Sequence, residues 1–181
     1  MAGRSPEDLG AEVAFETVVV DEGGTVVLRH RARARMLVED LGGGIGLAMV
    51  LVPGGRFLMG SPDGQGFEDE RPRHEVSVEP FRIGRHPVTQ AQWRRVVGPP
   101  RSRFRGDCLP VDGVSWWLAR DICRRLSEAT GRAYRLPGEA ECEHACRAGS
   151  AAPFCFGDTL TTEVANYIEP SRTGQGYPAS T

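Results

Sequence analysis

The sequence contains no lysine, and all 22 of its basic residues are arginine. This absence excludes chemistry that needs a side-chain amine, such as a Schiff base, a phosphate-loop lysine or a lysine general base. Acidic residues number 24, so the formal net charge is −2. Such a small charge gives no electrostatic indication of nucleic-acid or membrane binding, and we expect neither partner.

The sequence also has no long apolar run. No window approaches the roughly 18 apolar residues of a membrane span, and no signal-peptide apolar region follows a basic start. The cysteines are odd in number and no export signal accompanies them, which indicates reduced thiols rather than a disulfide framework. The five positions are Cys108, Cys123, Cys142, Cys146 and Cys155. We therefore expect a cytoplasmic protein of bacterial type.

The 181 residues are enough for one domain with extensions. Residues 1–14 form a polar lead-in, and residues 15–46 are predicted to form a β-hairpin followed by a glycine-rich joint. Two Val-rich runs around Glu22-Gly23-Gly24 carry the hairpin prediction. The run RHRARARM in the second strand is either an anion-binding strip or a solvated edge-strand face, and we favour the solvated face. The LGGGIG stretch at 41–46 is a flexible joint, because no helix follows it as a phosphate-binding loop requires.

Residues 47–181 are predicted to form the main domain. Apolar runs at 47–52 and 57–59 flank Pro53-Gly54-Gly55 and predict a second hairpin, and residues 74–88 are strand-like. Three helices are expected after these strands: one from a Thr89 capping box to about Val97, one from Ser115 to Gly131, and one after Pro137. The apolar stripe of the second helix is Ala119, Ile122, Cys123, Leu126 and Ala129. Because strands precede helices instead of alternating with them, we predict a compact, loop-rich α+β fold.

Two groups of residues are candidate metal ligands. The acidic loop residues Asp63, Glu68, Asp69 and Glu70 do not have EF-hand spacing, so a solvated loop is favoured. Cys142 and Cys146 share a helix face, but His144 lies roughly 160° away around the helix. Cys123 and Cys155 would complete a zinc site only by chance of folding. Of the two interpretations, a metal site or a structural sequence signature in which single residues have changed, we favour the structural signature.

Five blocks of this sequence, in order, resemble the formylglycine-generating enzyme (sulfatase-modifying factor) family. They are VPGGRFLMGS, HEVSVEPFRIGRHPVTQAQW, PVDGVSWWLA, YRLPGEAECEHACRAG and FGDTLTTEVANY, within about Leu47 to Tyr167. The resemblance implies the family's loop-rich α+β fold, which is related to C-type-lectin-like folds. The family pattern has Thr, Trp and Tyr where this chain has Gly138, Cys142 and His144, so the third helix departs from it.

The resemblance implies copper- and oxygen-dependent oxidation of a sulfatase cysteine to formylglycine, with a sulfatase-type cysteine peptide as partner. The family's catalytic cysteines lie near Gly-Asn-x-Trp-Glu-Trp and Arg-Gly-Gly-Ser-Trp blocks, and neither block occurs in these 181 residues. We therefore expect a domain truncated at its C-terminus, with no catalytic residue of its own and no activity alone. The same resemblance gives Asn166 and Tyr167 as ligands of the family's structural calcium, and copper and calcium as cofactors of the complete domain.

Of two other interpretations, only the first is compatible with the residues. A non-catalytic module could bind a peptide or protein on the same fold, and exposed aromatics would favour it. Trp116, Trp117, Trp93 and Phe104 are the candidates, although we expect Trp116 and Trp93 to be core anchors. Kinship to the non-haem iron sulfoxide synthases would need a histidine-rich iron site, which four scattered histidines do not provide. An incomplete domain would expose apolar surface, so self-association is expected.

Overall fold

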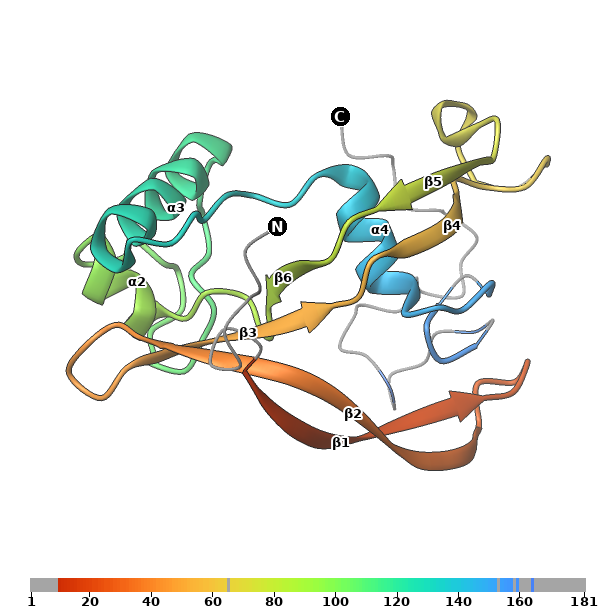
Figure 1. Ribbon diagram of the computed structural model, residues 1–181, viewed down its shortest axis with the longest axis horizontal. Helices are drawn as coiled ribbons and strands as arrows, with labels where there is room; N and C mark the ends of the chain where they lie inside the picture. The colour runs from red at the N-terminus through yellow and green to blue at the C-terminus, as the bar shows by residue number, and fades with distance from the viewer. Residues whose placement is uncertain (1–9, 65, 153, 158, 160–163, 165–181) are drawn as a thin grey trace, which may run out of the picture.

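The computed structural model describes residues 10–64, 66–152, 154–157, 159 and 164, and arranges them as two antiparallel sheets with three α-helices (Figure 1). The four-stranded sheet has the order β1 (Ala11–Val20), β2 (Val26–Asp40), β3 (Gly46–Val52) and β6 (Phe81–Gly84). The two-stranded sheet pairs β4 (Gly55–Met59) with β5 (His74–Val78). The helices are α2 (Gln90–Val96), α3 (Trp116–Thr130) and α4 (Glu139–Arg147), with a 3-10 turn, η1 (Glu68–Glu70), in the acidic loop. This is the predicted mixture of strands, helices and long loops.

The N-terminal hairpin is confirmed, and it is longer than its turn signal alone indicates. β1 pairs with β2 from Ala11–Met36 to Val20–Val26, and β2 then continues to pair with β3 from Met36 to Asp40. The glycine-rich segment predicted as a flexible joint is the turn between β2 and β3. In this turn the Leu41 amide donates to the Ile45 carbonyl at 2.9 Å. The hairpin and the main sheet are thus continuous through β2.

The hairpin predicted around Pro53-Gly54-Gly55 is wrong. The two strands that flank this segment, β3 and β4, belong to different sheets, so the chain changes sheets here instead of folding back on itself. A Cβ atom on Gly54 would lie 2.6 Å from the Val78 carbonyl oxygen, so glycine lets the backbone pass close to the end of β5. Proline and glycine mark a change of direction in the sequence, but they do not specify which strand each flanking run will join.

The three predicted helices are confirmed together with their caps. The Thr89 hydroxyl accepts from the Gln92 amide at 3.3 Å, and the Gln92 side chain accepts from the Thr89 amide at 2.9 Å. Ser115 accepts from the Leu118 amide at the start of α3, and Gly131 ends this helix in the left-handed conformation at φ 71°. These local signals are strong because each satisfies backbone groups that a helix end leaves unpaired.

The hydrophobic core lies where α2 and α3 pack against strand β3 of the large sheet. Its buried members are Leu47 from β3, Trp93 from α2, and Ile122 and Leu126 from α3. The expectation that Trp93 is a core anchor is confirmed, because only 6% of its surface is exposed. None of the described helices is long and apolar enough to cross a bilayer.

The expectation that Trp116 is a core anchor is wrong. Trp116 is 55% exposed and its neighbour Trp117 is 70% exposed. Both lie in the first turn of α3, ahead of the buried stripe, and Trp116 is about 120° around the helix from Ile122. Helical periodicity therefore directs Trp116 away from the core, whatever its size.

Candidate functional site

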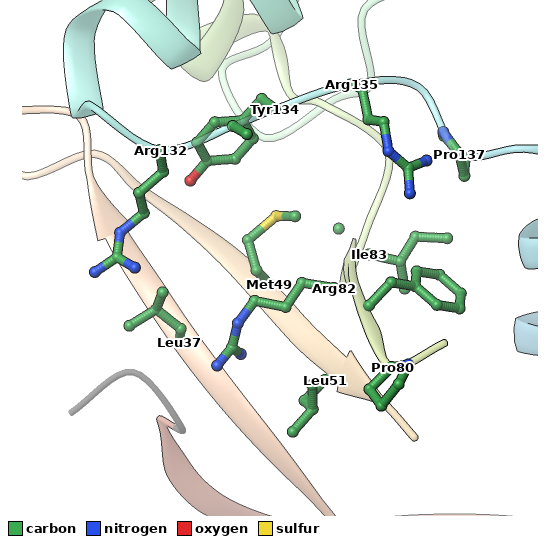
Figure 2. Close-up of a pocket in the computed structure, with 13 residues that line it drawn as sticks. Leu37, Met49, Leu51, Pro80, Arg82, Ile83, Arg132, Tyr134, Arg135 and Pro137 are labelled. Carbon is green, nitrogen blue, oxygen red and sulfur yellow. The ribbon is translucent and has the colours of Figure 1, made fainter. Parts of the chain in front are cut away.

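The described part of the chain contains a cleft between the large sheet and the segment that follows α3. Figure 2 shows this Tyr134 cleft, which has a volume of about 330 Å³. Its walls come from β2, β3, β6 and residues 132–137. The lining residues are Leu37, Met49, Leu51, Pro80, Phe81, Arg82, Ile83, Gly84, Arg132, Ala133, Tyr134, Arg135 and Pro137. An apolar hollow beside several polar groups is the usual form of a small binding site.

Strand register places the apolar floor of the cleft on one face of the sheet. Leu37 is opposite Met49, and Met49 is opposite Gly84 on β6. Leu51 is opposite Arg82 in the same way, and directly opposed residues share a face. The guanidinium groups of Arg82, Arg132 and Arg135 surround this floor (Figure 2). The cleft therefore combines an aliphatic surface with an arginine rim, in which Arg132 is ion-paired with Glu39 and Arg135 with Glu141. This combination suits an apolar group attached to a hydrogen-bond acceptor.

Tyr134 is held at the cleft by a buried carboxylate. Its hydroxyl donates to Glu39 Oε2 at 2.8 Å, and Arg132 Nε lies 3.2 Å from the same oxygen. The Glu39 side chain is only 15% exposed. Burial raises the pKa of Tyr134, and the hydrogen bond to Glu39 raises this pKa further. Tyr134 is therefore protonated at neutral pH and acts as a hydrogen-bond donor, not as a base.

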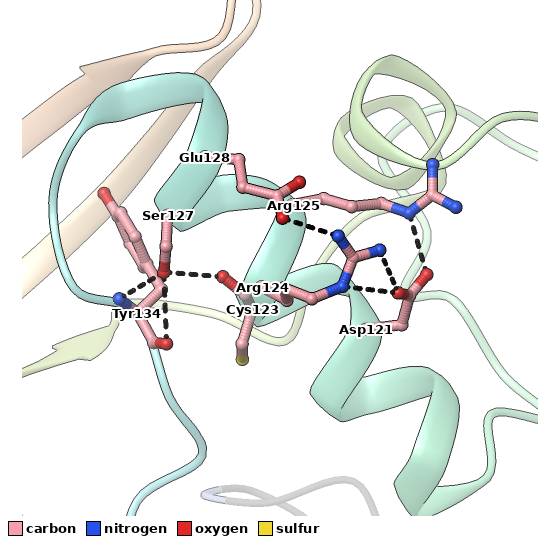
Figure 3. Close-up of polar contacts among 7 residues, drawn as sticks. All are labelled: Asp121, Cys123, Arg124, Arg125, Ser127, Glu128 and Tyr134. Carbon is pink, nitrogen blue, oxygen red and sulfur yellow. Dashed lines mark hydrogen bonds and ion pairs between the residues drawn. The ribbon is translucent and has the colours of Figure 1, made fainter.

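The backbone of Tyr134 is fixed to α3 by Ser127 (Figure 3). The Ser127 hydroxyl accepts from the Tyr134 amide at 2.8 Å and lies 2.9 Å from the Cys123 carbonyl, to which it can donate. On the outer face of α3, Asp121 accepts from Arg124 and Arg125 at 2.7 Å. These two arginines lower the pKa of Asp121 through their hydrogen bonds. Ser127 thus connects helix α3 to Tyr134 in the wall of the cleft.

An exposed aromatic pair lies at the start of α3, beside a second and more open cavity of about 530 Å³. The Trp116 and Trp117 rings meet edge to face with centroids 4.8 Å apart. The Arg120 guanidinium lies 4.9 Å from the Trp116 ring centroid and 5.4 Å from that of Trp117. This second cavity shares Tyr134 and Arg135 with the Tyr134 cleft, so the two hollows adjoin. Phe104, the remaining aromatic candidate, is also exposed but does not line either cavity.

The Arg135 side chain is fixed by the start of α4. It donates two hydrogen bonds of 2.6 Å to the Glu141 carboxylate, and Glu141 also accepts from the Gly138 amide at 2.7 Å. Glycine at the N-cap supplies no side-chain acceptor, so only this half of the Thr-type capping box of the family pattern remains. Arg135 first, and then the Gly138 amide, lower the pKa of Glu141 to about 2.

Glu141→Gln is expected to reduce the acid sensitivity of the fold. Folding lowers the pKa of Glu141 from its ordinary value of 4.5. The ionised Glu141 side chain therefore stabilises the folded protein at pH values above 4.5, and this stabilisation is lost as the pH falls towards about 2. After allowance for solvent screening, the lost stabilisation should amount to about 1 kcal/mol. Urea unfolding between these two pH values measures it. Glu139→Gln, on the same helix turn, is the control, and equal effects of the two changes would contradict the assignment.

The residues considered as a metal site are not brought together. Cys142 and Cys146 are exposed on α4, while His144 Nε2 lies 3.0 Å from the Pro53 carbonyl oxygen. A carbonyl only accepts, so Nε2 carries the hydrogen, and the imidazole also packs on Phe57 at 5.2 Å. Among the described residues no three His, Cys, Asp or Glu side chains are grouped to hold a metal ion. His144 thus links α4 to the segment between β3 and β4.

The copper that the family resemblance implies does not fit these cysteines. A copper(I) site needs thiolates that converge in a shielded position. Cys142 and Cys146 are exposed, and burial, Cys146 and Glu141 all raise the pKa of Cys142. This environment favours the thiol over the thiolate that binds metal. Asn166 and Tyr167, the residues given for calcium by resemblance, lie outside the described residues.

The residues that define the cleft were not found by sequence reasoning. Glu39 and Tyr134 are 95 positions apart, and they meet only because β2 and the segment after α3 cover the same face of the sheet. The one local signal was Tyr134, a large polar aromatic directly after the Gly131 helix stop. Buried tyrosines generally need a hydrogen-bond partner, so the sequence could have predicted that a partner exists, but not which residue it is.

Comparison with known proteins gives one family and several relatives. The family model described as "Sulfatase-modifying factor enzyme 1-like domain" matches residues 45–179. The inactive C-alpha-formylglycine-generating enzyme 2 of Bos taurus is 42% identical over 97 residues, which are 54% of this chain and 32% of that protein. The formylglycine-generating enzyme of Mycobacterium tuberculosis is 28% identical over 165 residues, covering 61% of this chain and 54% of that protein.

The solved structure of PvdO from Pseudomonas aeruginosa has a TM-score of 0.57 and 31% identity to this chain. The match covers 65% of this chain and 53% of PvdO. The predicted loop-rich α+β fold is thereby confirmed. The chain spans about a quarter or less of the length of the first curated relatives that it matches.

Proposed function

The chain belongs to the sulfatase-modifying factor enzyme 1-like domain family, and from this premise we propose that its described residues form the peptide-facing, non-catalytic part of a formylglycine-generating-enzyme-like domain. The observation that carries the proposal is the Tyr134 cleft, with its aliphatic floor and arginine rim. The hydroxyl group in the cleft, that of Tyr134, already donates its hydrogen bond to Glu39. These groups can bind and orient a peptide side chain, but they cannot remove its proton or electrons.

The disposition of the cysteines supports the non-catalytic part of the proposal. Cysteine oxidation in the family is copper- and oxygen-dependent by resemblance, and Cys142 and Cys146 do not provide a shielded thiolate pair. Neither sequence block that accompanies the family's catalytic cysteines occurs in the 181 residues. Copper and calcium are therefore assigned to a complete domain, and the natural partner is a sulfatase-type cysteine peptide.

A sulfatase-derived cysteine peptide is expected to bind this chain without being converted to formylglycine. The peptide would be incubated with the chain, copper(I) and oxygen, and conversion followed by mass spectrometry, with the M. tuberculosis formylglycine-generating enzyme as the active control. In parallel, fluorescence anisotropy of a labelled peptide measures binding. Leu37→Gln, in the cleft wall, should weaken binding about tenfold by making the apolar floor polar.

Leu58→Gln provides the matched control, because Leu58 is an exposed leucine on β4 that does not line the cleft. Its binding should stay within about twofold of the parent chain, as expected for a surface change. Copper-dependent conversion above the protein-free blank would overturn the non-catalytic part of the proposal. Equal losses for the two leucine variants would overturn the assignment of the peptide to the cleft.

A second candidate function is a binding module for another protein, independent of cysteine oxidation. The exposed Trp116–Trp117 pair with Arg120 supports it, because exposed tryptophan beside arginine is typical of protein contact surfaces. The same surface supports self-association of the chain. Trp117→Ala would separate this candidate from the first, since Trp117 does not line the Tyr134 cleft.

A further inference from the structure

The long N-terminal hairpin extends beyond the core and carries a row of arginines. We call residues 11–20 and 26–35 the β1–β2 arm. In Figure 1 it extends past the part of β2 that pairs with β3. It also precedes residues 45–179, the part of the chain that the family model matches. The arm is therefore an addition to the matched domain.

Four arginines occupy one face of the arm. Arg29, Arg31, Arg33 and Arg35 alternate along β2, so they share a face, and all four are exposed. We call them the arginine row. Successive members are separated by about 6.7 Å along the strand. Leu37, the next residue on this face, lines the Tyr134 cleft, so the row leads directly towards the cleft.

Only two of the four arginines are neutralised within the arm. Arg29 pairs with Glu16 at 3.1 Å, and Arg33 pairs with Glu12 at 2.7 Å. Arg31 and Arg35 lie directly opposite these glutamates in the β1–β2 register, yet they form no ion pair with a described residue. The arginine face therefore keeps two positive charges that are not neutralised within the arm, at Arg31 and Arg35. A solvated edge strand, the interpretation favoured from sequence, explains exposure but not this excess of one sign.

The β2 strand also has an open backbone edge beside the row. Residues 26–36 pair with β1 on one side, and only residues 36–40 pair with β3 on the other. No described strand pairs with residues 26–35 on that second side. An edge of this kind accepts an additional strand through main-chain hydrogen bonds.

The opposite face of the arm is mainly apolar along the same edge, with His30 and the opposing Thr17 as its polar members. Leu28, Ala32 and Ala34 alternate with the arginines, and Val13 and Phe15 of β1 lie opposite two of them. Phe15 and Leu28 are both substantially exposed. A strand added at this edge would thus meet arginines on one face and mainly aliphatic groups, with His30 among them, on the other.

We propose that the open edge of β2 binds an extended peptide in which acidic and apolar residues alternate. Its carboxylates would lie beside the arginine row, and its apolar side chains would continue the surface of Leu28, Ala32 and Ala34. In the peptide, as in β2, side chains alternate between the two faces of the strand. Every second residue of the peptide would therefore lie beside a member of the arginine row. Opposed side chains in such a pair have Cβ atoms about 5 Å apart, within reach of a charge-assisted hydrogen bond.

The observations favour a peptide over a nucleic acid. A phosphodiester chain has no groups that pair with a strand edge, and it has no apolar side chains for the second face. It would also meet Glu12 and Glu16 on the arginine face. A strand on the open edge lies on the side of β2 away from β1, with its carboxylates next to the arginines and roughly two strand spacings, about 10 Å, from those glutamates.

Fluorescence anisotropy of a labelled peptide of sequence EVEVEVE tests the proposal with the full chain. At about 0.05 M salt the parent chain should bind it, and Arg31→Ser/Arg35→Ser should bind about tenfold more weakly because two charge contacts are lost. Arg101→Ser/Arg105→Ser removes the same charge elsewhere and should stay within about twofold. Arg31→Lys/Arg35→Lys should retain most of the affinity. QVQVQVQ and the permuted EEEEVVV should both bind weakly.

Several results would overturn the proposal. Equal losses of peptide affinity in the two serine double variants would show that only the net charge of the chain matters, not the position of the arginines. Equal binding of EEEEVVV would exclude a strand-like register, and tighter binding of an oligothymidylate with the same arginine dependence would indicate a nucleic-acid site. Self-association that disappears in Arg31→Ser/Arg35→Ser, measured by sedimentation, would make a second copy of this chain the occupant. Because Arg31 and Arg35 are exposed and lack ion pairs with described residues, unchanged thermal unfolding should accompany every variant.

Discussion

Replacing Trp93 by alanine is expected to lower the free energy of unfolding by about 3–5 kcal/mol. The effect should be large because Trp93 belongs to the small cluster of buried residues in the described part of the chain, where it joins α2 to Leu47 and α3. A domain of this size typically has about 5–15 kcal/mol of total stability. The variant should therefore be partly unfolded at physiological temperature, as measured by urea titration with circular dichroism.

Trp117→Ala is the matched control for this prediction. It removes the same side chain from a position that is 70% exposed, and its effect should be within about 0.5 kcal/mol. Similar losses for the two tryptophans would contradict the placement of the core. They would indicate that the first turn of α3 is covered in the folded protein.

Replacing Glu39 by alanine is expected to have the second-largest effect, about 2–3 kcal/mol of unfolding free energy. Glu39 accepts from the Tyr134 hydroxyl and forms an ion pair with Arg132, so its removal leaves a half-buried hydroxyl without its acceptor and an exposed guanidinium without this counter-ion. Tyr134→Phe should cost about 1 kcal/mol by itself. In a double-mutant cycle the two changes should be less than additive, because both remove the same hydrogen bond.

Glu16→Ala is the control for Glu39, since it removes a glutamate from an exposed pair with Arg29. Its cost should be below about 0.5 kcal/mol, as is usual for surface ion pairs. Strict additivity of Glu39→Ala and Tyr134→Phe would contradict the hydrogen bond that defines the cleft. The cleft would then lack the group that fixes its one hydroxyl.

Local features of this fold could be predicted from sequence because each has its cause within a few residues. The Thr89 box, the Ser115 cap and the Gly131 stop all satisfy backbone groups of their own helix. The failures occurred where the cause is distant. The sheet change at Gly54 depends on Val78 and Pro80, and the exposure of Trp116 depends on which face of α3 meets the core.

The candidate site was harder to predict than the fold. The close spacing of Cys142, His144 and Cys146 is typical of metal ligands, so the sequence points to α4. In the structure His144 is directed to Pro53, away from the two exposed cysteines. The preference for a structural signature over a metal site stays a prediction. The cleft itself combines β2, β3, β6 and residues 132–137, and no local pattern indicates that combination.

The division of the chain into residues 1–14, 15–46 and 47–181 stays a prediction, as does its kinship with C-type-lectin-like folds. The continuity of β2 across the arm and the main sheet is the structural fact that bears on that division. The arginine row and Leu37 in the wall of the cleft therefore lie on the same strand.

The central claim is that the Tyr134 cleft binds the cysteine peptide, and chemical-shift mapping of the isotope-labelled chain tests it most directly. The amide resonances of Leu37, Met49, Arg82 and Tyr134 should shift on titration with the peptide, in proportion to its binding curve. Resonances of Cys142 and Cys146 on α4 should stay in place. Shifts centred on those cysteines, with none at Leu37 or Tyr134, would contradict the account and return the candidate site to α4.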